Sequence, residues 1–144
     1  YHNRRPVADC TLQYFSSVMD LAHWADYLVI AVAGGQATRH MVNSEVLQAL
    51  GANGYLINIA RGTVVDEAAL IDALTHQRIA GAGLDVFEDE PHVPAALMAL
   101  DNVVLTPHIA SGTHDTRRAM ADLVLENLRS FYATGAVREP VPGT

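Results

Sequence analysis

The sequence predicts an α/β fold with a parallel β-sheet, and three observations lead to this prediction. Half of the 144 residues are apolar, which is enough to bury one core. Short runs of β-branched and aliphatic residues alternate with helical patterns along the chain, and alternating strands and helices form parallel sheets with right-handed crossovers. Polar residues follow several of the predicted strands, where open α/β sheets bind their ligands.

The first 33 residues predict a turn, a short strand, a helical turn and a longer strand. The dipeptide Arg5-Pro6 disfavours a helix, so the chain is expected to begin with a turn or a strand end. Residues 11–16 favour a short strand and residues 18–24 a helical turn. Residues 27–33 are a continuous apolar run with β-branched residues, which is typical of a strand buried on both faces.

A helix and a further strand are predicted next. The helix is expected at residues 43–50, with Ser44 as its N-terminal cap and Gly51 as its stop. Residues 54–60 are mostly apolar and predict the strand.

The remaining elements continue the alternation. Asp66 is expected to cap a helix that ends near His76. Two strands are predicted at residues 79–87 and 103–105, followed by a long amphipathic helix at residues 113–133. Residues 135–144 are expected to form a tail outside the domain.

The composition excludes several classes of partner. The formal charge of −7, without a large basic cluster, argues against nucleic acid. Cys10 is the single cysteine, which excludes an internal disulfide and a cysteine-based metal site; no metal is expected, and a cytoplasmic setting fits. No apolar run reaches the ~20 residues of a membrane span and no signal-peptide pattern is present, so no membrane partner is expected.

Three polar groups fall at or just after the ends of successive predicted strands: Arg61, the acidic cluster 85–90 and His108. The carboxyl ends of parallel strands share one edge, so these groups can converge on one crevice. Arg61 is then a candidate anchor for an anionic substrate, since it can hold a carboxylate by two parallel hydrogen bonds. Its local sequence leaves open a second interpretation, a surface arginine in an ion pair.

His108 is the candidate proton donor and acceptor. Imidazole titrates near neutral pH, which suits the interconversion of a carbonyl and an alcohol. A carboxylate bound to the imidazole would favour its protonated form and fix its tautomer, and Glu90 is the candidate. The alternative is a loop histidine bonded to the backbone, with residues 88–90 as a solvated acidic turn.

An arginine, a histidine and a carboxylate form a coherent set for reducing a 2-oxo acid. No side chain stores a hydride, so the reaction would require a nicotinamide cofactor.

Three segments resemble the signature blocks of the D-isomer-specific 2-hydroxyacid dehydrogenases in order and spacing. They are residues 58–66 (NIARGTVVD), 81–91 (GAGLDVFEDEP) and 106–109 (TPHI). The resemblance implies a Rossmann-type doubly wound parallel sheet, with residues 1–134 as the C-terminal part of the NAD(P)-binding domain.

Members of this family carry a glycine-rich phosphate loop and a substrate domain earlier in the sequence. The resemblance therefore implies an incomplete fold that lacks its first βα unit, the glycine-rich loop and the substrate domain. Without the helix whose amino terminus receives the pyrophosphate, these 144 residues alone are expected to bind NADP weakly and to have negligible reductase activity.

The same resemblance implies a role for each motif residue. Arg61 would bind the substrate carboxylate and keto oxygen, His108 would be the general acid or base, and Glu90 would tune His108. Ser111 would join Arg61 and His108 in binding the substrate, and Asp85 matches the position that contacts the nicotinamide carboxamide. The implied cofactor-binding residues are Asn3, Arg4, Arg5, Val32, Ala33, Ile59, Ala60, Asp85 and Ala110.

Residues 2–6 are similar to the segment after the second Rossmann strand in glyoxylate and hydroxypyruvate reductases. An acidic residue there would bind the ribose 2′-hydroxyl of NAD, whereas Arg4 and Arg5 offer positive charge for the 2′-phosphate of NADP. NADP is therefore the expected cofactor and NAD the alternative. Viewed in isolation, the two arginines could also be merely solvated.

The intact protein is expected to reduce glyoxylate, hydroxypyruvate or a related small 2-oxo acid with NADPH. The exposed apolar face expected for the helix at residues 113–133 favours dimerisation or aggregation of this chain. The intact protein is expected to be a homodimer. Two alternatives remain open: a non-catalytic dinucleotide sensor resembling the corepressors related to this family, and an NAD-dependent dehydrogenase of another branch, acting on phosphoglycerate or D-lactate.

Overall fold

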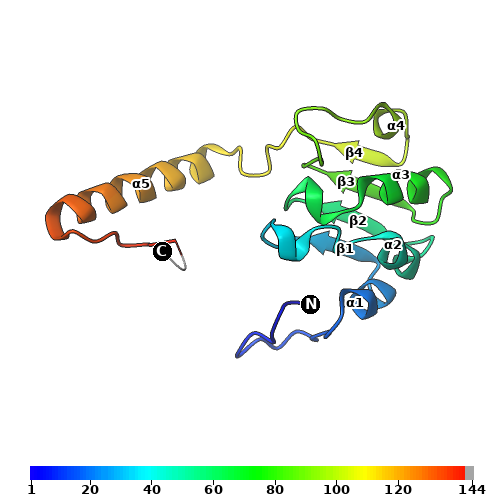
Figure 1. The fold of residues 1–144 in the computed structure, drawn as a ribbon, viewed down its shortest axis with the longest axis horizontal. Coiled ribbons are helices and arrows are strands. Elements are labelled where there is room, and N and C mark those ends of the chain that lie inside the picture. The colour runs from blue at the N-terminus through cyan, green and yellow to red at the C-terminus, as the bar shows by residue number, and fades with distance from the viewer. Residues whose placement is uncertain (142–144) are drawn as a thin grey trace. The chain divides into compact units, whose positions relative to one another are not determined.

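The structure, a computed structural model, describes residues 1–141; residues 142–144 of the predicted tail lie outside the described residues. Contacts within the chain divide it into two compact units, Tyr1–His108 and Ile109–Thr144. The first unit contains the sheet, and the second is built on one long helix (Figure 1).

The first unit is organised around a parallel sheet that has four strands within the described residues. The strands are β1 (Tyr27–Ile30), β2 (Tyr55–Asn58), β3 (Gly81–Leu84) and β4 (Val103–Leu105). They are ordered β1-β2-β3-β4, and each neighbouring pair is parallel (Figure 1). The α/β fold with a parallel sheet that the sequence predicts is confirmed. Because strand order follows chain order, right-handed crossovers place the connecting helices on the same face.

The helices of this unit are short. They are α1 (Val18–Trp24), α2 (Ser44–Leu50), α3 (Glu67–Thr75) and α4 (Ala95–Met98), with single turns of 3₁₀ helix at η1 (Gln36–Thr38) and η2 (Gly62–Val64). The core lies between these helices and one face of the sheet, where Leu47 of α2, Leu70 and Leu74 of α3 and Leu56 of β2 are all buried.

The other face of the sheet is exposed in the described part of the chain. Tyr27 and Val29 of β1 are 64% and 55% exposed, whereas the residues that alternate with them are buried. Tyr27 stacks on Tyr55 of β2, with ring centroids 5.2 Å apart. The prediction that residues 27–33 form a strand buried on both faces is therefore wrong, because burial alternates along β1 even though its residues are apolar.

Other predicted boundaries also change. The strand predicted at residues 11–16 is reduced to an isolated bridge between Phe15 and His2. Asn43 rather than Ser44 caps α2, since its side-chain oxygen accepts two hydrogen bonds from amides of the first turn. β1, β2 and β3 are shorter than predicted, and α4 was not predicted. The predictions of α1, of α3 with its aspartate cap and of β4 are confirmed.

The second unit contains α5 (His114–Thr134), the long amphipathic helix that the sequence predicts. The Thr113 hydroxyl caps it by accepting from the Thr116 amide, and Gly135 ends it in the left-handed conformation with φ 76°. None of the residues of α5 is buried. Across residues 1–141, no helix has the length and apolar character that crossing a membrane requires.

Candidate active site

The structure brings the predicted polar residues to one edge of the sheet. Arg61 follows β2, Asp85 follows β3 and His108 follows β4. The ladder continues past the strand ends, where the Asp85 amide donates to the Asn58 carbonyl at 3.0 Å. The three residues thus stand on neighbouring strands at their carboxyl ends, as the parallel sheet requires.

A buried asparagine and two glycines shape the chain around Arg61. Asn58 is 1% exposed; its side-chain amide donates to the Arg61 carbonyl at 3.1 Å and its oxygen accepts from the Ala60 amide at 3.0 Å. A Cβ added to Gly34 would lie 2.6 Å from the Arg61 Cγ, and one added to Gly62 would overlap the backbone that follows β3. Only residues without a side chain allow these close approaches.

The Arg61 side chain lies at the surface of the unit. Its Nη1 donates to the Ala60 carbonyl at 2.6 Å, and within residues 1–141 it forms no salt bridge. Its positive charge still helps to lower the pKa of Glu90, although less than the contacts described next. The interpretation of Arg61 as half of a surface ion pair is not supported.

Glu90 and His108 lie in contact, as the sequence predicts. The His108 Nδ1 lies 2.7 Å from the Glu90 Oε2, and the other carboxylate oxygen accepts from the Phe87 amide at 3.0 Å. The hydrogen bond with His108 holds the pKa of the Glu90 carboxyl below its usual range. Partial burial of the carboxyl raises this pKa, and the hydrogen bond from the Phe87 amide lowers it further. An ionised Glu90 can orient the ring through Nδ1, an arrangement in which Nε2 is available for proton exchange.

The backbone at His108 is tightly constrained. Its φ of 54° lies in the left-handed region, and its amide donates to the Thr106 carbonyl at 3.1 Å across Pro107. The Thr106 hydroxyl donates to the Asp85 carboxylate at 2.5 Å, and Asp85 is 5% exposed. Left-handed non-glycine residues are uncommon and concentrate where function constrains the chain.

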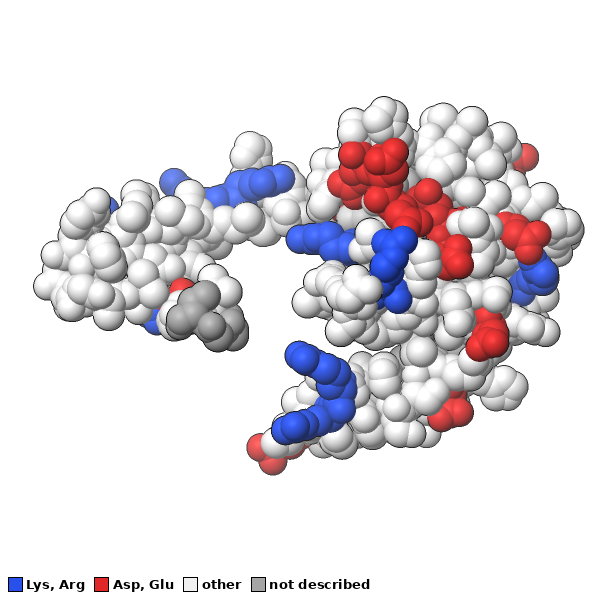
Figure 2. Space-filling view, in the orientation of Figure 1, with Lys and Arg blue, Asp and Glu red and all other residues white. Residues whose placement is uncertain are grey.

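A cavity of about 740 Å³ lies at the carboxyl end of β1. Its lining combines the N-terminal segment 1–4 with the loop at residues 31–38. Asn3, Arg4, Val32 and Ala33, all predicted to bind the cofactor, line this cavity. Arg5 instead lines a neighbouring hollow of about 480 Å³ together with Asn3 and Arg4. The basic side chains of this segment form a blue patch in Figure 2.

The remaining predicted residues divide between the two units. Ile59 is 47% exposed and Ala60 is buried, directly before Arg61. Ala110 and Ser111 belong to the second unit. The roles assigned to these four residues, like those of the other site residues, stay predictions.

An ionic cluster that sequence reasoning did not assign lies beside this site. Glu88 Oε1 accepts from Arg39 Nη2 at 2.8 Å and lies 3.0 Å from His40 Nε2. The hydrogen bond with His40 holds the pKa of the Glu88 carboxyl below its usual range. Partial burial raises this pKa, and the hydrogen bond from Arg39 lowers it. Acidic and basic side chains lie side by side on the face shown in Figure 2. The signal that could have revealed this cluster, an arginine and a histidine 49 and 48 residues before a glutamate, is too remote to interpret without the fold.

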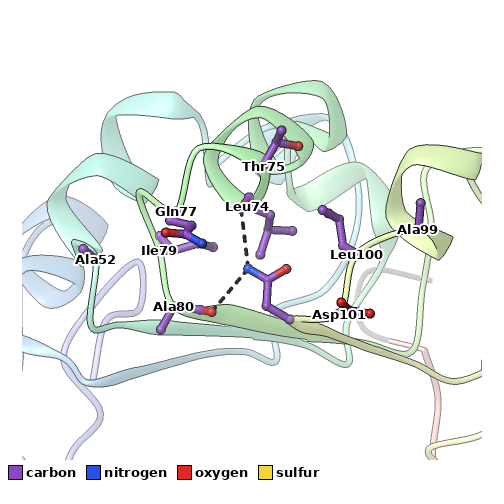
Figure 3. A pocket seen from close by; sticks show the side chains of 10 residues that line it. Ala52, Leu74, Thr75, Gln77, Ile79, Ala80, Ala99, Leu100 and Asp101 are labelled. Atoms are coloured by element: carbon purple, nitrogen blue, oxygen red, sulfur yellow. Dashed lines mark hydrogen bonds between the residues drawn. The ribbon is translucent and has the colours of Figure 1, made fainter.

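A hollow of about 540 Å³ opens at the opposite edge of the sheet, before the strands begin (Figure 3). Ala80 and Asn102 line it, and the Asn102 side-chain amide donates to the Leu74 and Ala80 carbonyls at 3.5 and 3.3 Å. Asp101 is the one charged residue in its lining. This hollow lacks an acid–base pair, so the carboxyl edge of the sheet is the candidate site.

Residues 1–110 match the family described as D-isomer specific 2-hydroxyacid dehydrogenase, NAD binding domain. The chain is 51% identical over 141 residues to glyoxylate/hydroxypyruvate reductase A of Arabidopsis thaliana, covering 98% of this chain and 45% of that protein. It is 46% identical over the same length to 2-ketogluconate reductase of Gluconobacter oxydans, covering 98% and 46%.

A similar solved structure is the NADPH-dependent glyoxylate/hydroxypyruvate reductase of Sinorhizobium meliloti, in complex with NADP and malonate. Its TM-score is 0.95 at 48% identity, covering 99% of this chain and 44% of that one. The chain thus spans less than half the length of these relatives.

Proposed function

The chain belongs to the D-isomer-specific 2-hydroxyacid dehydrogenases, and on that premise we propose that the whole protein reduces a small 2-oxo acid, glyoxylate or hydroxypyruvate, with NADPH. The motif resemblance described above is confirmed by the family match. The 2-oxo acid class is supported by the names of the similar reductases from Arabidopsis thaliana and Sinorhizobium meliloti.

The observation that carries this proposal is the pairing of His108 with Glu90 on the edge that also bears Arg61. The nicotinamide ring, when bound, supplies the hydride that this set of side chains lacks. Arg61 binds the substrate carboxylate and polarises the neighbouring carbonyl. His108, protonated and oriented through Nδ1, donates a proton from Nε2 to the carbonyl oxygen, which becomes the hydroxyl of the product.

The cavity beside β1 supports a nucleotide cofactor. Its loop supplies a largely apolar wall through residues such as Val32 and Ala33, and Arg4 stands in its lining. Apolar walls with a few placed polar groups are typical of cofactor sites, and a guanidinium binds phosphate in a bidentate geometry. We therefore propose that Arg4, with Arg5 beside it, binds the 2′-phosphate of NADP.

The remaining features of the whole protein are proposals of the same kind. Residues 1–134 form part of the NAD(P)-binding domain, and the exposed face of the sheet around Tyr27 and Tyr55 packs against another part of the protein. The protein is a homodimer, which the exposed apolar residues of α5 support. A cytoplasmic location fits the single Cys10.

Steady-state oxidation of NADPH by the full-length protein over a panel of 2-oxo acids tests the proposal. Turnover of glyoxylate or hydroxypyruvate is expected, with NADPH preferred over NADH. Tight cofactor binding without turnover of any acid would instead favour a dinucleotide sensor, and a preference for NADH would favour another branch of the family.

A further inference from the structure

The loop that lines the cofactor cavity is fastened to the acidic turn after β3 through one carboxylate. Residues 31–38 and Met41 line the cavity, whereas Arg39 and His40, which stand between them in the chain, are outside its lining. Both of these side chains bind Glu88 instead, at 2.8 Å from Arg39 Nη2 and 3.0 Å from His40 Nε2 to the same carboxylate oxygen. The carboxylate therefore holds the end of the loop from outside the cavity.

The backbone of His40 is held at the same point. Its φ of 49° lies in the left-handed region, and its amide donates to the Thr63 carbonyl at 2.9 Å. Backbone strain of this kind persists only where the surrounding contacts over-determine the conformation. The bond to Thr63 and the contact with Glu88 are two contacts that hold His40 from its backbone and from its side chain.

Glu88 is in turn fixed to the proposed catalytic edge. Its amide donates to Glu67 Oε2 at 3.2 Å, and Gly62, next to Arg61, packs directly against the peptide that precedes Glu88. Two residues further on, Glu90 binds His108. One short turn thus supports the acid–base pair and holds the cofactor loop.

We propose that Glu88 is a positioning residue for the cofactor: with Arg39 and His40 it holds the loop at residues 31–38 in the conformation that receives the nicotinamide nucleotide. This inference rests on the proposed function. Glu88 acts through the loop and does not touch the cofactor or the substrate. A loop that is already ordered loses less conformational entropy on binding, so Glu88 contributes to cofactor affinity and little to the chemical step.

Three variants of the full-length protein test this inference. Glu88→Gln keeps the size of the side chain and removes its charge. His40→Asn keeps a residue that tolerates the left-handed backbone, but its side chain is too short to reach Glu88. Asp89→Asn is the matched control, because Asp89 lies in the same turn with a side chain that is 89% exposed and pairs with His92 at 3.6 Å.

NADPH binding is measured by fluorescence titration, and KM and kcat are measured separately with the same preparations. Glu88→Gln and His40→Asn are each expected to raise the Kd and KM for NADPH roughly fivefold, since each weakens a charge-assisted hydrogen bond. The kcat is expected to stay within about twofold, and Asp89→Asn to bind NADPH like the unaltered protein. The double variant is expected to resemble Glu88→Gln, because the contact that His40→Asn removes is already weakened when Glu88 loses its charge.

Unchanged NADPH affinity in Glu88→Gln would overturn the inference. It would also be overturned if the fold-increases in Kd of the two single variants multiplied in the double variant. The same holds if NADPH binding and kcat fell equally and in proportion to the unfolded fraction seen in thermal unfolding. If the unaltered protein binds NADPH but reduces no 2-oxo acid, the proposed function fails while the titration still decides the role of Glu88. If it binds neither NADPH nor NADH, both proposals are overturned.

Discussion

Replacing Glu90 by glutamine tests the acid–base pair directly. The amide can still accept from Phe87, but the negative charge beside His108 is lost. A hydrogen bond to a charged group contributes about 1.5–3 kcal/mol. The two side chains are 46% and 34% exposed, so solvent screening reduces this to about 1 kcal/mol.

A loss of about 1 kcal/mol corresponds to roughly a fivefold lower kcat for reduction. The ionised Glu90 holds the His108 ring through Nδ1, and the neutral amide would hold it less firmly in the orientation that the proposed proton transfer needs.

The rate of NADPH oxidation by the full-length protein, at saturating NADPH and 2-oxo acid, provides the assay. Glu126→Gln, which removes an ion pair with Arg138 in the second unit, is the matched control and should leave kcat unchanged. A Glu90→Gln variant with the kcat of the unaltered protein would refute a functional role for the pairing.

Three further predictions concern stability and cofactor choice. Desolvation raises the pKa of Glu67, and the backbone hydrogen bond that its carboxylate accepts from Glu88 opposes this rise. Because the pKa is higher in the folded state than in the unfolded state, Glu67 favours folding below its unfolded pKa and loses this effect as the pH rises through its folded pKa. Glu67→Gln should therefore raise the free energy of unfolding by about 0.5 kcal/mol at pH 7 and by less at pH 4. A larger increase at pH 4 than at pH 7 in thermal unfolding would contradict the raised pKa. Gly62→Ala should cost about 3 kcal/mol in urea unfolding because its Cβ meets backbone, whereas Gly83→Ala, which meets only a side-chain methyl at 3.1 Å, should cost less. The double substitution Arg4→Ser with Arg5→Ser should raise the KM for NADPH roughly tenfold and leave the KM for NADH unchanged. Equal increases in the KM for NADPH and for NADH would show that the two arginines do not bind the 2′-phosphate.

The residues predicted best are those whose position follows from the end of a strand. Arg61 and His108 lie where the parallel sheet puts them, and Glu90 reaches His108 over 18 residues because both follow neighbouring strands. An apolar run predicts that a strand exists but not how long it is, because the run continues past the last residue that forms hydrogen bonds with the neighbouring strand.

What the sequence could not predict depends on contacts between distant segments. Asn58 belongs to a recognised motif, yet its burial and its bond to the Arg61 carbonyl emerge only in the folded chain. The partnership of Glu88 with Arg39 and His40 has no local signal at all. A residue's own sequence neighbourhood indicates its secondary structure, whereas the choice of a partner depends on the topology.

The uniform strand order sets the spacing of the candidate site residues along the carboxyl edge of the sheet. Neighbouring strands lie about 4.8 Å apart, so the three steps from β1 to β4 amount to roughly 14 Å. The cavity proposed for the nucleotide stands at the β1 end of this edge, whereas Arg61, Asp85 and His108 follow β2, β3 and β4. On the proposed function, a cofactor with its 2′-phosphate at Arg4 therefore has to extend along the edge until its nicotinamide reaches Asp85, between Arg61 and His108, where hydride and proton are delivered to the same carbonyl group.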